Sequence, residues 1–394
     1  MRRQARAASS ASRTARARRA ATARRQGPAP ATGSSPRTAA SPRGAPPVLV
    51  EVTRGDRVES RHRGSVAVVS AAGKNVAFVG DPRTFTFIRS SAKPFQLAPF
   101  VASGRFDTYD FPSPVEALAI MAASHAGEDR HARTVQALLR AGGLTRDVLA
   151  CGTHPPFDRE TAERLLRDGE PPSELRHNCS GKHAGMALHA KAAGWPVESY
   201  WQADHPVQQL ALDTVATLAD MPRDQVVCAT DGCGVVSFGL PLDRLALAFA
   251  RLADPSGVAD ASLRSALERT RDAMMAHPEL VGGERRQLDT ALMRGAPGKL
   301  VAKGGAEGVQ AVGLLAGGHG RGKGALGLAI KMEDGDAARR ARSVSTIAAL
   351  AQLGALNEAT VNARLAAFAS PPILDPRGDP AGEVRAAFTL KDAR

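Results

Sequence analysis

Ser90 and Lys93 form an S-x-x-K pattern, a spacing that can support nucleophilic catalysis. The pattern follows a β-branched, aromatic run and opens a stretch with helical periodicity. Residues three positions apart share one face of a helix, so the lysine amine can reach the serine hydroxyl. A partly desolvated lysine loses its proton near neutral pH and can then act as the base that activates a serine. The alternative is an N-cap serine beside a solvated lysine, because the pattern is common by chance.

A second serine, Ser124, lies next to His125 at the end of an apolar helical run. Such a pair forms either the wall of a site or a buried pair with its own hydrogen bonds, and taken alone the buried pair is favoured. Lys303 precedes two glycines just ahead of an apolar strand. This segment resembles the K-[ST]-G strand of acyl-transfer sites, except that Gly304 replaces the hydroxyl residue. A solvated turn lysine is the alternative interpretation of Lys303.

Small and reactive residues crowd the segment 177–186, where Cys179, Lys182 and His183 lie about one helical turn apart. A thiol nucleophile paired with His183 is conceivable, but residues four apart on one short segment rarely align as nucleophile and base. A glycine-flanked turn at 230–234 holds Asp231 and Cys233. Neither cysteine belongs to a C-x-x-C pair, so the spacing alone is weak evidence for a metal.

The elements that must position these residues follow from periodicity and turn signals. Strands are predicted at 48–53, 64–70, 75–80 and 84–88, with a further pair at 309–316 and 325–332. Helices are predicted at 94–102, 114–126, 131–142, 161–168, 183–194, 206–220, 242–253, 262–276 and 337–353. This order predicts an α/β body whose sheet takes strands from both ends of the chain. Its length allows one large domain or two coupled subdomains.

The net charge of the 394-residue chain is +13, which by itself would suggest a polyanionic partner. Residues 1–46 contain eleven of the 52 basic residues and no acidic one. The remaining 348 residues therefore carry 41 basic and 39 acidic side chains, so the body is nearly neutral. We expect the segment 1–46 to be a disordered basic tail, since its composition offers no apolar periodicity to order it. Neither a nucleic acid nor a membrane surface is expected to bind the body.

Composition also bears on the class of protein and its compartment. No stretch approaches the ~20 consecutive apolar residues of a membrane span. Four cysteines in so long a chain make no disulfide framework, and reduced thiols in the cytoplasm are expected.

Several of these segments together resemble one family, the bacterial L-asparaginases of the Rhizobium etli type, also called the asparaginase II family. The matching pieces, in chain order, are RSSAKPFQ, ASHAGE, NCSGKHAG, TDGCG, PLDRLALAFA, LDTALM, KGGAEGV and ALGLAIKMEDG. The resemblance spans residues 48–335 and extends the expected asparaginase domain to the whole body, 47–394. Several motifs in the same order are far more specific than any one of them.

The resemblance implies a fold similar to that of the serine β-lactamases, with a sheet packed by helices. It also implies a homodimer that hydrolyses L-asparagine to L-aspartate and ammonia through a Ser–Lys acyl-transfer mechanism. The implied catalytic pairs are Ser90 with Lys93 and Ser124 with Lys303; which serine attacks is left open, with Ser90 favoured because it belongs to the S-x-x-K pattern. The expected substrate-binding residues are Arg89, His125, Asn178 and Asp231. The family's zinc site falls on Cys179, Lys182 and Cys233, and we do not expect the metal to be essential for the chemistry.

Two other classes of protein remain as alternatives. The first is another serine acyl hydrolase of the same fold, such as a β-lactamase, a D-amino-acid peptidase or an esterase. The missing S-D-N element and the missing hydroxyl after Lys303 argue against it. The second is a non-enzymatic basic binding protein, which the near-neutral body disfavours.

Overall fold

The computed structural model describes residues 44–393. The predicted basic tail, 1–46, therefore lies outside the described residues except for its last three positions. Within 44–393, nine strands form one antiparallel sheet with the order β10-β11-β1-β2-β9-β8-β7, and β3 joins β2 and β12 beside this path. A three-stranded sheet has the order β4-β6-β5. The strands are β1 Val48–Arg54, β2 Arg57–Ser70, β3 Asn75–Val79, β4 Phe85–Phe87, β5 Val227–Thr230, β6 Val236–Pro241, β7 Leu300–Gly304, β8 Val309–Leu314, β9 Leu326–Met332, β10 Pro372–Leu374, β11 Pro380–Ala386 and β12 Lys391–Asp392.

The large sheet joins the two ends of the described chain. Strand β1 pairs with β11 on one side and with β2 on the other, and β2 continues the sheet to β9. The second half of β2 is apolar and buried on both faces, as expected for a strand covered by helices from both sides. The predicted α/β fold with strands from both chain ends is confirmed, and so is the pairing of the two late strands, now β8 and β9.

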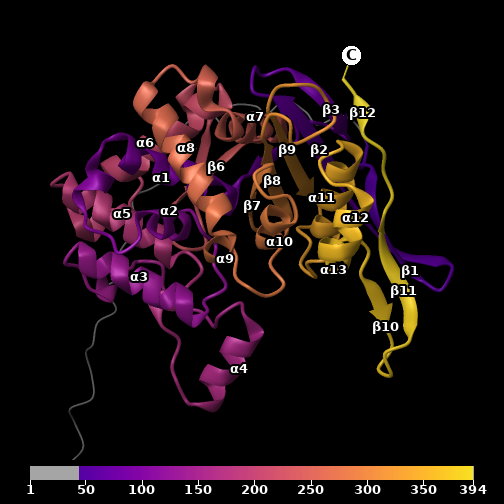
Figure 1. The fold of residues 1–394 in the computed structure, drawn as a ribbon, viewed down its shortest axis with the longest axis horizontal. Coiled ribbons are helices and arrows are strands. Elements are labelled where there is room, and N and C mark those ends of the chain that lie inside the picture. The colour runs from indigo at the N-terminus through magenta and orange to yellow at the C-terminus, as the bar shows by residue number, and fades with distance from the viewer. Residues whose placement is uncertain (1–43, 394) are drawn as a thin grey trace, which may run out of the picture. The chain divides into compact units, whose positions relative to one another are not determined.

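Helices cover both faces of this sheet (Figure 1). The paired strands β7 and β8 have a helix on each face. Gly313 of β8 faces α7, whereas Gly304 of β7 points to the opposite face of the sheet, towards α11. Most other helices lie beside the sheet on the left of Figure 1, where α1 packs against α5, α6 and α8. The helices are α1 Lys93–Ala102, α2 Pro114–Met121, α3 Asp129–Ala141, α4 Arg159–Arg167, α5 Ser180–Ala192, α6 Pro206–Ala219, α7 Leu242–Ala253, α8 Ala261–Ala276, α9 Pro278–Val281, α10 Leu288–Gly295, α11 Ala341–Gln352, α12 Glu358–Thr360 and α13 Ala366–Ala369.

One departure from the predicted elements lies at the end of α2, and α10, β5, β6 and β7 were not predicted. The apolar run predicted a helix over 114–126, but α2 ends at Met121. The residues that follow are irregular, and the backbone N–H of Ser124 donates to the Val281 carbonyl oxygen at 3.0 Å. A contact distant in sequence thus overrides helix propensity, and it sets Ser124 on a non-helical backbone.

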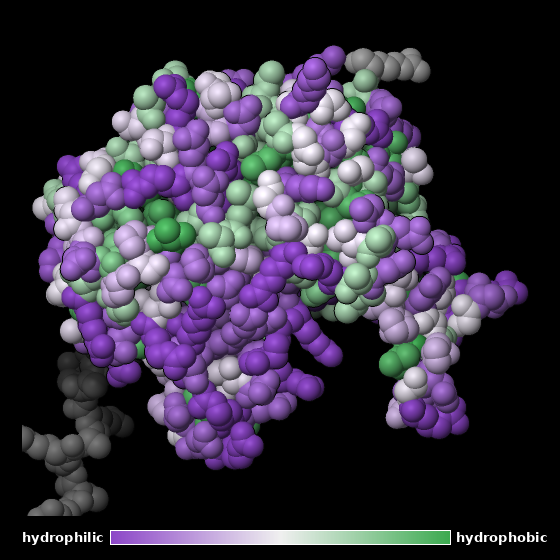
Figure 2. All heavy atoms as spheres, viewed as in Figure 1, coloured by the Kyte–Doolittle hydropathy of each residue, from purple (hydrophilic) through white to green (hydrophobic). Residues whose placement is uncertain are grey.

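The surface is predominantly polar on the face shown in Figure 2, where hydrophilic side chains gather over α3 and α4. Arg164 and Arg176 both bind the Asp129 carboxylate in this region, at 2.7 and 2.6 Å. No helix within residues 44–393 is long and apolar enough to cross a membrane.

Candidate active site

Ser90 and Lys93 lie where the short 3₁₀ helix Arg89–Ala92 runs into α1. The helix begins with strain, because Arg89 has a φ of +50°, a left-handed conformation that non-glycine residues seldom adopt. Such strain is retained where the surrounding structure requires one backbone geometry, and it is typical of functional sites. The strained residue here immediately precedes Ser90.

The Lys93 amine is fully buried and has three oxygen partners. Its Nζ lies 2.5 Å from the Ala123 carbonyl oxygen, 2.8 Å from Ser124 Oγ and 3.3 Å from the Asn178 carbonyl oxygen. Burial lowers the pKa of Lys93, against the nearby charge of Cys179, which raises it. These three oxygens match the three N–H donors of the ammonium, and the lowered pKa makes one of those protons easier to lose.

The other lysine, Lys303, belongs to the buried strand β7 and faces Asp289 from α10. Its Nζ lies 3.5 Å from Asp289 Oδ2 and donates to the Gly304 carbonyl oxygen at 2.8 Å. Burial lowers the pKa of Lys303 to about 8, although the Asp289 charge opposes the shift. Asp289 also accepts from the Gly304 N–H at 2.9 Å and from Gln310 Nε2 at 2.9 Å. Asp289 therefore fixes both the lysine and the backbone that follows it.

A pocket of about 340 Å³ connects these groups. Its lining includes Ser90, Ser124, Asn178, Asp289, Lys303 and Arg342. The volume lies within the range of small-molecule sites, and the convergent polar groups are typical of an active site.

The lysine–serine pairs differ from those that the resemblance implies. Lys93 hydrogen bonds to Ser124, whereas no side-chain hydrogen bond joins Ser90 to either lysine within residues 44–393. Lys303 bonds to Asp289 and Gly304 instead of Ser124, because the carboxylate attracts its ammonium. All four expected catalytic side chains nevertheless belong to one site: three line the pocket, and Lys93 contacts one of the lining serines.

The four expected substrate-binding residues lie in different surroundings. Asn178 lines the pocket, and its carbonyl oxygen also holds Lys93. Arg89 and Asp231 bind each other, with Nε 2.8 Å from Oδ1. His125 is fully buried, 2.9 Å from Ser180 Oγ and stacked on His131, whereas its neighbour Ser124 lines the pocket. Of this Ser–His pair, only the serine therefore forms part of the site wall. Burial lowers the pKa of His125 well below its usual range, so the ring is neutral.

The residues expected to hold zinc form a buried cluster beside Lys93. Lys182 Nζ lies 3.0 Å from Cys233 Sγ, and a hydrogen bond from Cys233 lowers the pKa of Cys179 well below its usual value. Two sulfurs and an amine suit zinc chemically, although a lysine binds a metal only after losing its proton. The charges of the two cysteines outweigh burial and raise the pKa of Lys182. No three His, Cys, Asp or Glu side chains cluster for a metal in the described part of the chain, so such a site requires the lysine.

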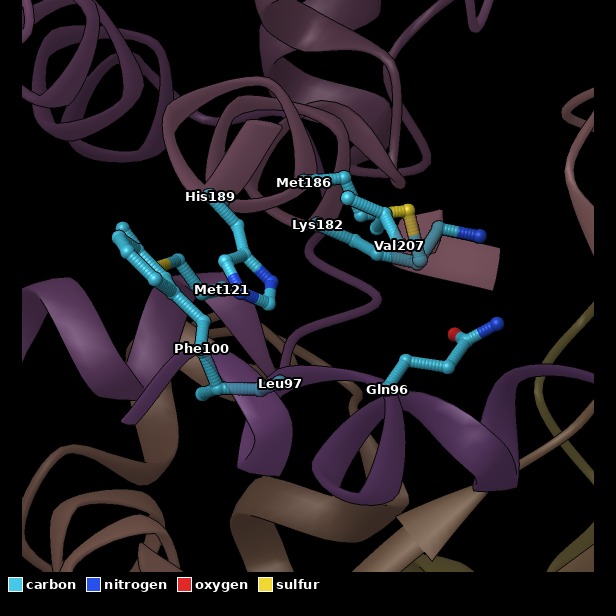
Figure 3. A pocket seen from close by; sticks show the side chains of 9 residues that line it. Gln96, Leu97, Phe100, Met121, Lys182, Met186, His189 and Val207 are labelled. Atoms are coloured by element: carbon cyan, nitrogen blue, oxygen red, sulfur yellow. The ribbon is translucent and has the colours of Figure 1, made fainter. Parts of the chain in front are cut away.

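A small cavity of about 10 Å³ lies beside the stem of Lys182 (Figure 3). Phe100, Met121 and Met186 line it together with His189, whose ring stacks on Phe100 at 5.1 Å. A volume of this size holds about one water molecule. Of these two cavities, only the one lined by Ser90 and Ser124 has room for an amino acid.

Asp289 and Arg342 are among the pocket residues that were not predicted from the sequence. Asp289 belongs to the segment LDTALM, which contributes to the family resemblance, but nothing in its spacing links it to Lys303, 14 residues later. Arg342 follows Asp336, which caps the start of α11 by accepting the backbone N–H of Arg342 at 2.9 Å. The sequence could have indicated this cap, because Asp336 precedes a helical run. It could not have indicated that the Arg342 side chain lines the pocket.

The family model described as L-asparaginase II matches residues 50–386. The chain therefore belongs to the asparaginase II family, and it is an amidohydrolase. No curated protein matches the chain by sequence.

Solved structures similar to this chain include two glutaminases and a β-lactamase. A probable glutaminase from Bacillus subtilis, complexed with 6-diazo-5-oxo-L-norleucine, is 12% identical, covering 74% of this chain and 84% of its own, with a TM-score of 0.37. A Bacillus glutaminase is also 12% identical, covering 74% of this chain and 91% of its own, with a TM-score of 0.35. A β-lactamase from Burkholderia ambifaria is 16% identical, covering 74% and 94%, with a TM-score of 0.35.

Proposed function

We propose that this protein is an L-asparaginase, which hydrolyses L-asparagine to L-aspartate and ammonia by acyl transfer through a serine. The observation that carries the proposal is the buried Lys93 amine, hydrogen-bonded to Ser124 at the edge of a pocket that also contains Ser90. Burial lowers the pKa of Lys93, so the amine loses its proton more readily and can then act as a base on a serine hydroxyl. Family membership supports the choice of an amide substrate.

Ser90 is the proposed nucleophile. It lines the pocket one helical turn ahead of Lys93, and its hydroxyl has no hydrogen-bond partner within residues 44–393. Its Oγ attacks the side-chain carbonyl carbon of asparagine while its proton passes to Lys93. Ser124, bound to Lys93, then relays that proton to the departing amide nitrogen as the C–N bond breaks and ammonia leaves. Water hydrolyses the resulting ester, which releases aspartate and restores the serine.

The negative charge that develops on the carbonyl oxygen needs a positive partner. The N–H groups of Gly304 and Gly305 already donate to Asp289 and to the Val309 carbonyl oxygen, so they are committed elsewhere. Lys303 carries a positive charge at neutral pH, since its pKa is about 8. We assign to Lys303 the stabilisation of the oxyanion.

The test is ammonia release from L-asparagine, L-glutamine and D-asparagine, with Ser90→Ala and Ser124→Ala as variants. Ser90→Ala should abolish turnover, and Ser124→Ala should slow it by roughly 100-fold, the usual contribution of a proton-transfer group. A diazoketone analogue of asparagine should alkylate the serine with loss of N2, so the peptide containing Ser90 should gain the mass of the reagent minus that of N2. Labelling of the Ser124 peptide would reverse the two roles, and nitrocefin turnover exceeding that of asparagine would favour a β-lactamase-like hydrolase instead.

Three further properties belong to the same proposal. Zinc, held by Cys179, Lys182 and Cys233, would supply a local positive charge and join α5 to the turn between β5 and β6. The proposed assembly is a homodimer, which light scattering of the full chain tests. The proposed location is the cytoplasm, supported by four cysteines that are all free thiols.

A further inference from the structure

Arg342 presents a guanidinium to the substrate pocket without a carboxylate partner. Its Nη1 donates to the Gly305 carbonyl oxygen at 2.9 Å and more weakly to the Val309 carbonyl oxygen at 3.4 Å. No Asp or Glu oxygen lies within ion-pair distance of this guanidinium among residues 44–393. Carbonyl oxygens satisfy its N–H groups, but they leave its positive charge without a counterion.

The acidic residues nearest to Arg342 are already occupied. Asp289 accepts hydrogen bonds from Lys303, Gly304 and Gln310. It makes no hydrogen bond to Arg342, and only its negative charge acts on the guanidinium from a longer distance. Asp336 accepts the backbone N–H groups at the start of α11, and its charge acts on Arg342 only from beyond ion-pair distance. A partly buried guanidinium without a paired anion is unfavourable, and an anionic ligand in the pocket would relieve that cost.

The position of Arg342 suits the α-carboxylate of an amino-acid substrate, the end opposite to the reacting amide. A Cβ built on Gly304 would lie 2.8 Å from Arg342 Nη1, so the guanidinium packs directly against the residue that follows Lys303. A side chain at position 304 would therefore displace this guanidinium. In asparagine only two carbons separate the reacting carbonyl from the α-carboxylate. Lys303 and Arg342 line the same pocket and their charges interact, which suits the two of them to the two ends of one small molecule.

The other cations of the region are less suitable. Arg89, expected from the sequence to bind the carboxylate, is neutralised by Asp231 at 2.8 Å. Arg339 also lines the pocket, but it is exposed and lies over the Phe157 ring at 5.1 Å. We propose that Arg342 binds the α-carboxylate of the substrate and restricts the enzyme to amides that carry this group. This inference rests on the proposed function and names the selectivity of the same site.

The test compares L-asparagine with 3-aminopropanamide, which has the same reacting amide and an amine but lacks the α-carboxylate. Wild-type enzyme should prefer asparagine by roughly 100-fold or more in kcat/KM, as expected when a lost ligand group leaves a site charge unpaired. Arg342→Met should lower kcat/KM for asparagine by about that factor and leave 3-aminopropanamide nearly unchanged, so that the preference collapses. Arg342→Lys, which keeps the charge without the planar fork, should retain part of the preference.

Arg339→Met is the matched control, because it removes the neighbouring pocket arginine, and it should leave the preference within about twofold. Equal losses for both amides in Arg342→Met would overturn the proposal, because they would indicate a structural role. Circular dichroism checks folding, and Arg342→Lys supplies the ratio if the methionine variant does not fold.

Binding separates this proposal from the proposed function. L-aspartate should raise the melting temperature of the wild type and of Arg339→Met but not of Arg342→Met. If the wild type releases no ammonia from either amide but shows this pattern, the asparaginase proposal fails and the carboxylate site stands. If L-aspartate stabilises Arg342→Met as well as it does the wild type, the carboxylate site is rejected.

Discussion

Lys93 Nζ lies 2.8 Å from Ser124 Oγ, although the two residues are 31 positions apart in the sequence. The lysine extends from the first turn of α1, and the serine lies just beyond the end of α2. Helix α5 also packs closely on α2, since a Cβ on Gly181 would lie 2.1 Å from the Ile120 carbonyl oxygen. The base and its serine are thus held by packed helices, which preorganises proton transfer.

Replacing Lys93 by methionine should abolish catalysis and leave the fold intact. Methionine fills a similar volume without a charge, so the core loses only the hydrogen bonds to the Ala123 and Asn178 carbonyls and to Ser124. Ammonia release should fall by at least ~100-fold, since the base is missing. Ser91→Ala, which removes a buried hydroxyl bonded to the Lys303 carbonyl oxygen, is a nearby control that should keep most of the activity. Substantial turnover by Lys93→Met would contradict the assigned base.

The pH dependence of kcat/KM should show a falling limb with a pKa of about 8, set by Lys303. The lysine acts as a cation, so activity is lost as the pH rises through this value. The negative charge of Asp289 raises the pKa of Lys303, and Asp289→Asn should therefore move the falling limb to lower pH. The profile is measured between pH 5.5 and 9.5, roughly centred on this pKa. A limb that stays in place in Asp289→Asn would exclude Lys303 as its source.

The parts of this protein that could be predicted from the sequence are those that depend on local periodicity. Helix α7 has the predicted bounds, 242–253, because its apolar residues recur along one face. The end of α2 could not be predicted, since the Ser124 N–H bond to Val281 overrides an apolar run. The short strand β6 was missed because a run of six residues, five of them buried, carries too weak a signal.

In the candidate site, too, local features could be predicted from the sequence and contacts between distant segments could not. Its residue types and motifs were predicted, but the partner of each lysine depends on contacts between distant elements. Lys93 turns into the core between α2 and α5, and Lys303 turns towards an acidic residue on α10. The i, i+3 spacing made a Ser90–Lys93 bond geometrically allowed, but it did not show that two buried carbonyls would attract the amine.

Zinc content should depend on Cys179 and Cys233 and not on Cys228. The first two sulfurs are buried beside Lys182, whereas Cys228 is exposed on β5. Metal analysis of purified wild-type protein should give about one zinc per chain, and Cys179→Ser or Cys233→Ser should lose it, because soft thiolate ligands are removed. Cys228→Ser is the matched control and should keep the metal. The zinc site would be rejected if purified wild-type protein contained no zinc while its buried thiols, titrated after unfolding, were still reduced.

Removing Asp158 should destabilise the region around α4 and change the acid sensitivity of the protein. Its carboxylate accepts from the Thr161 N–H at 2.9 Å as the N-cap of α4, and it binds Arg285 through two hydrogen bonds. Hydrogen bonds from Arg285 lower the pKa of Asp158 to about 2, from the ordinary 3.8. The stabilisation is therefore complete above about pH 4 and is lost as the pH falls towards 2.

Asp158→Ala should lower the free energy of unfolding at pH 7 by about 1–3 kcal/mol, the range for a lost cap together with buried hydrogen bonds. Denaturant unfolding at a series of pH values measures it, and the difference from wild type should shrink as the pH falls from 4 to 2. Asp272→Ala breaks an exposed ion pair with Arg271 and should cost less than about 1 kcal/mol. A difference between Asp158→Ala and wild type that stays constant down to pH 2 would show that the carboxylate charge contributes nothing to the cap.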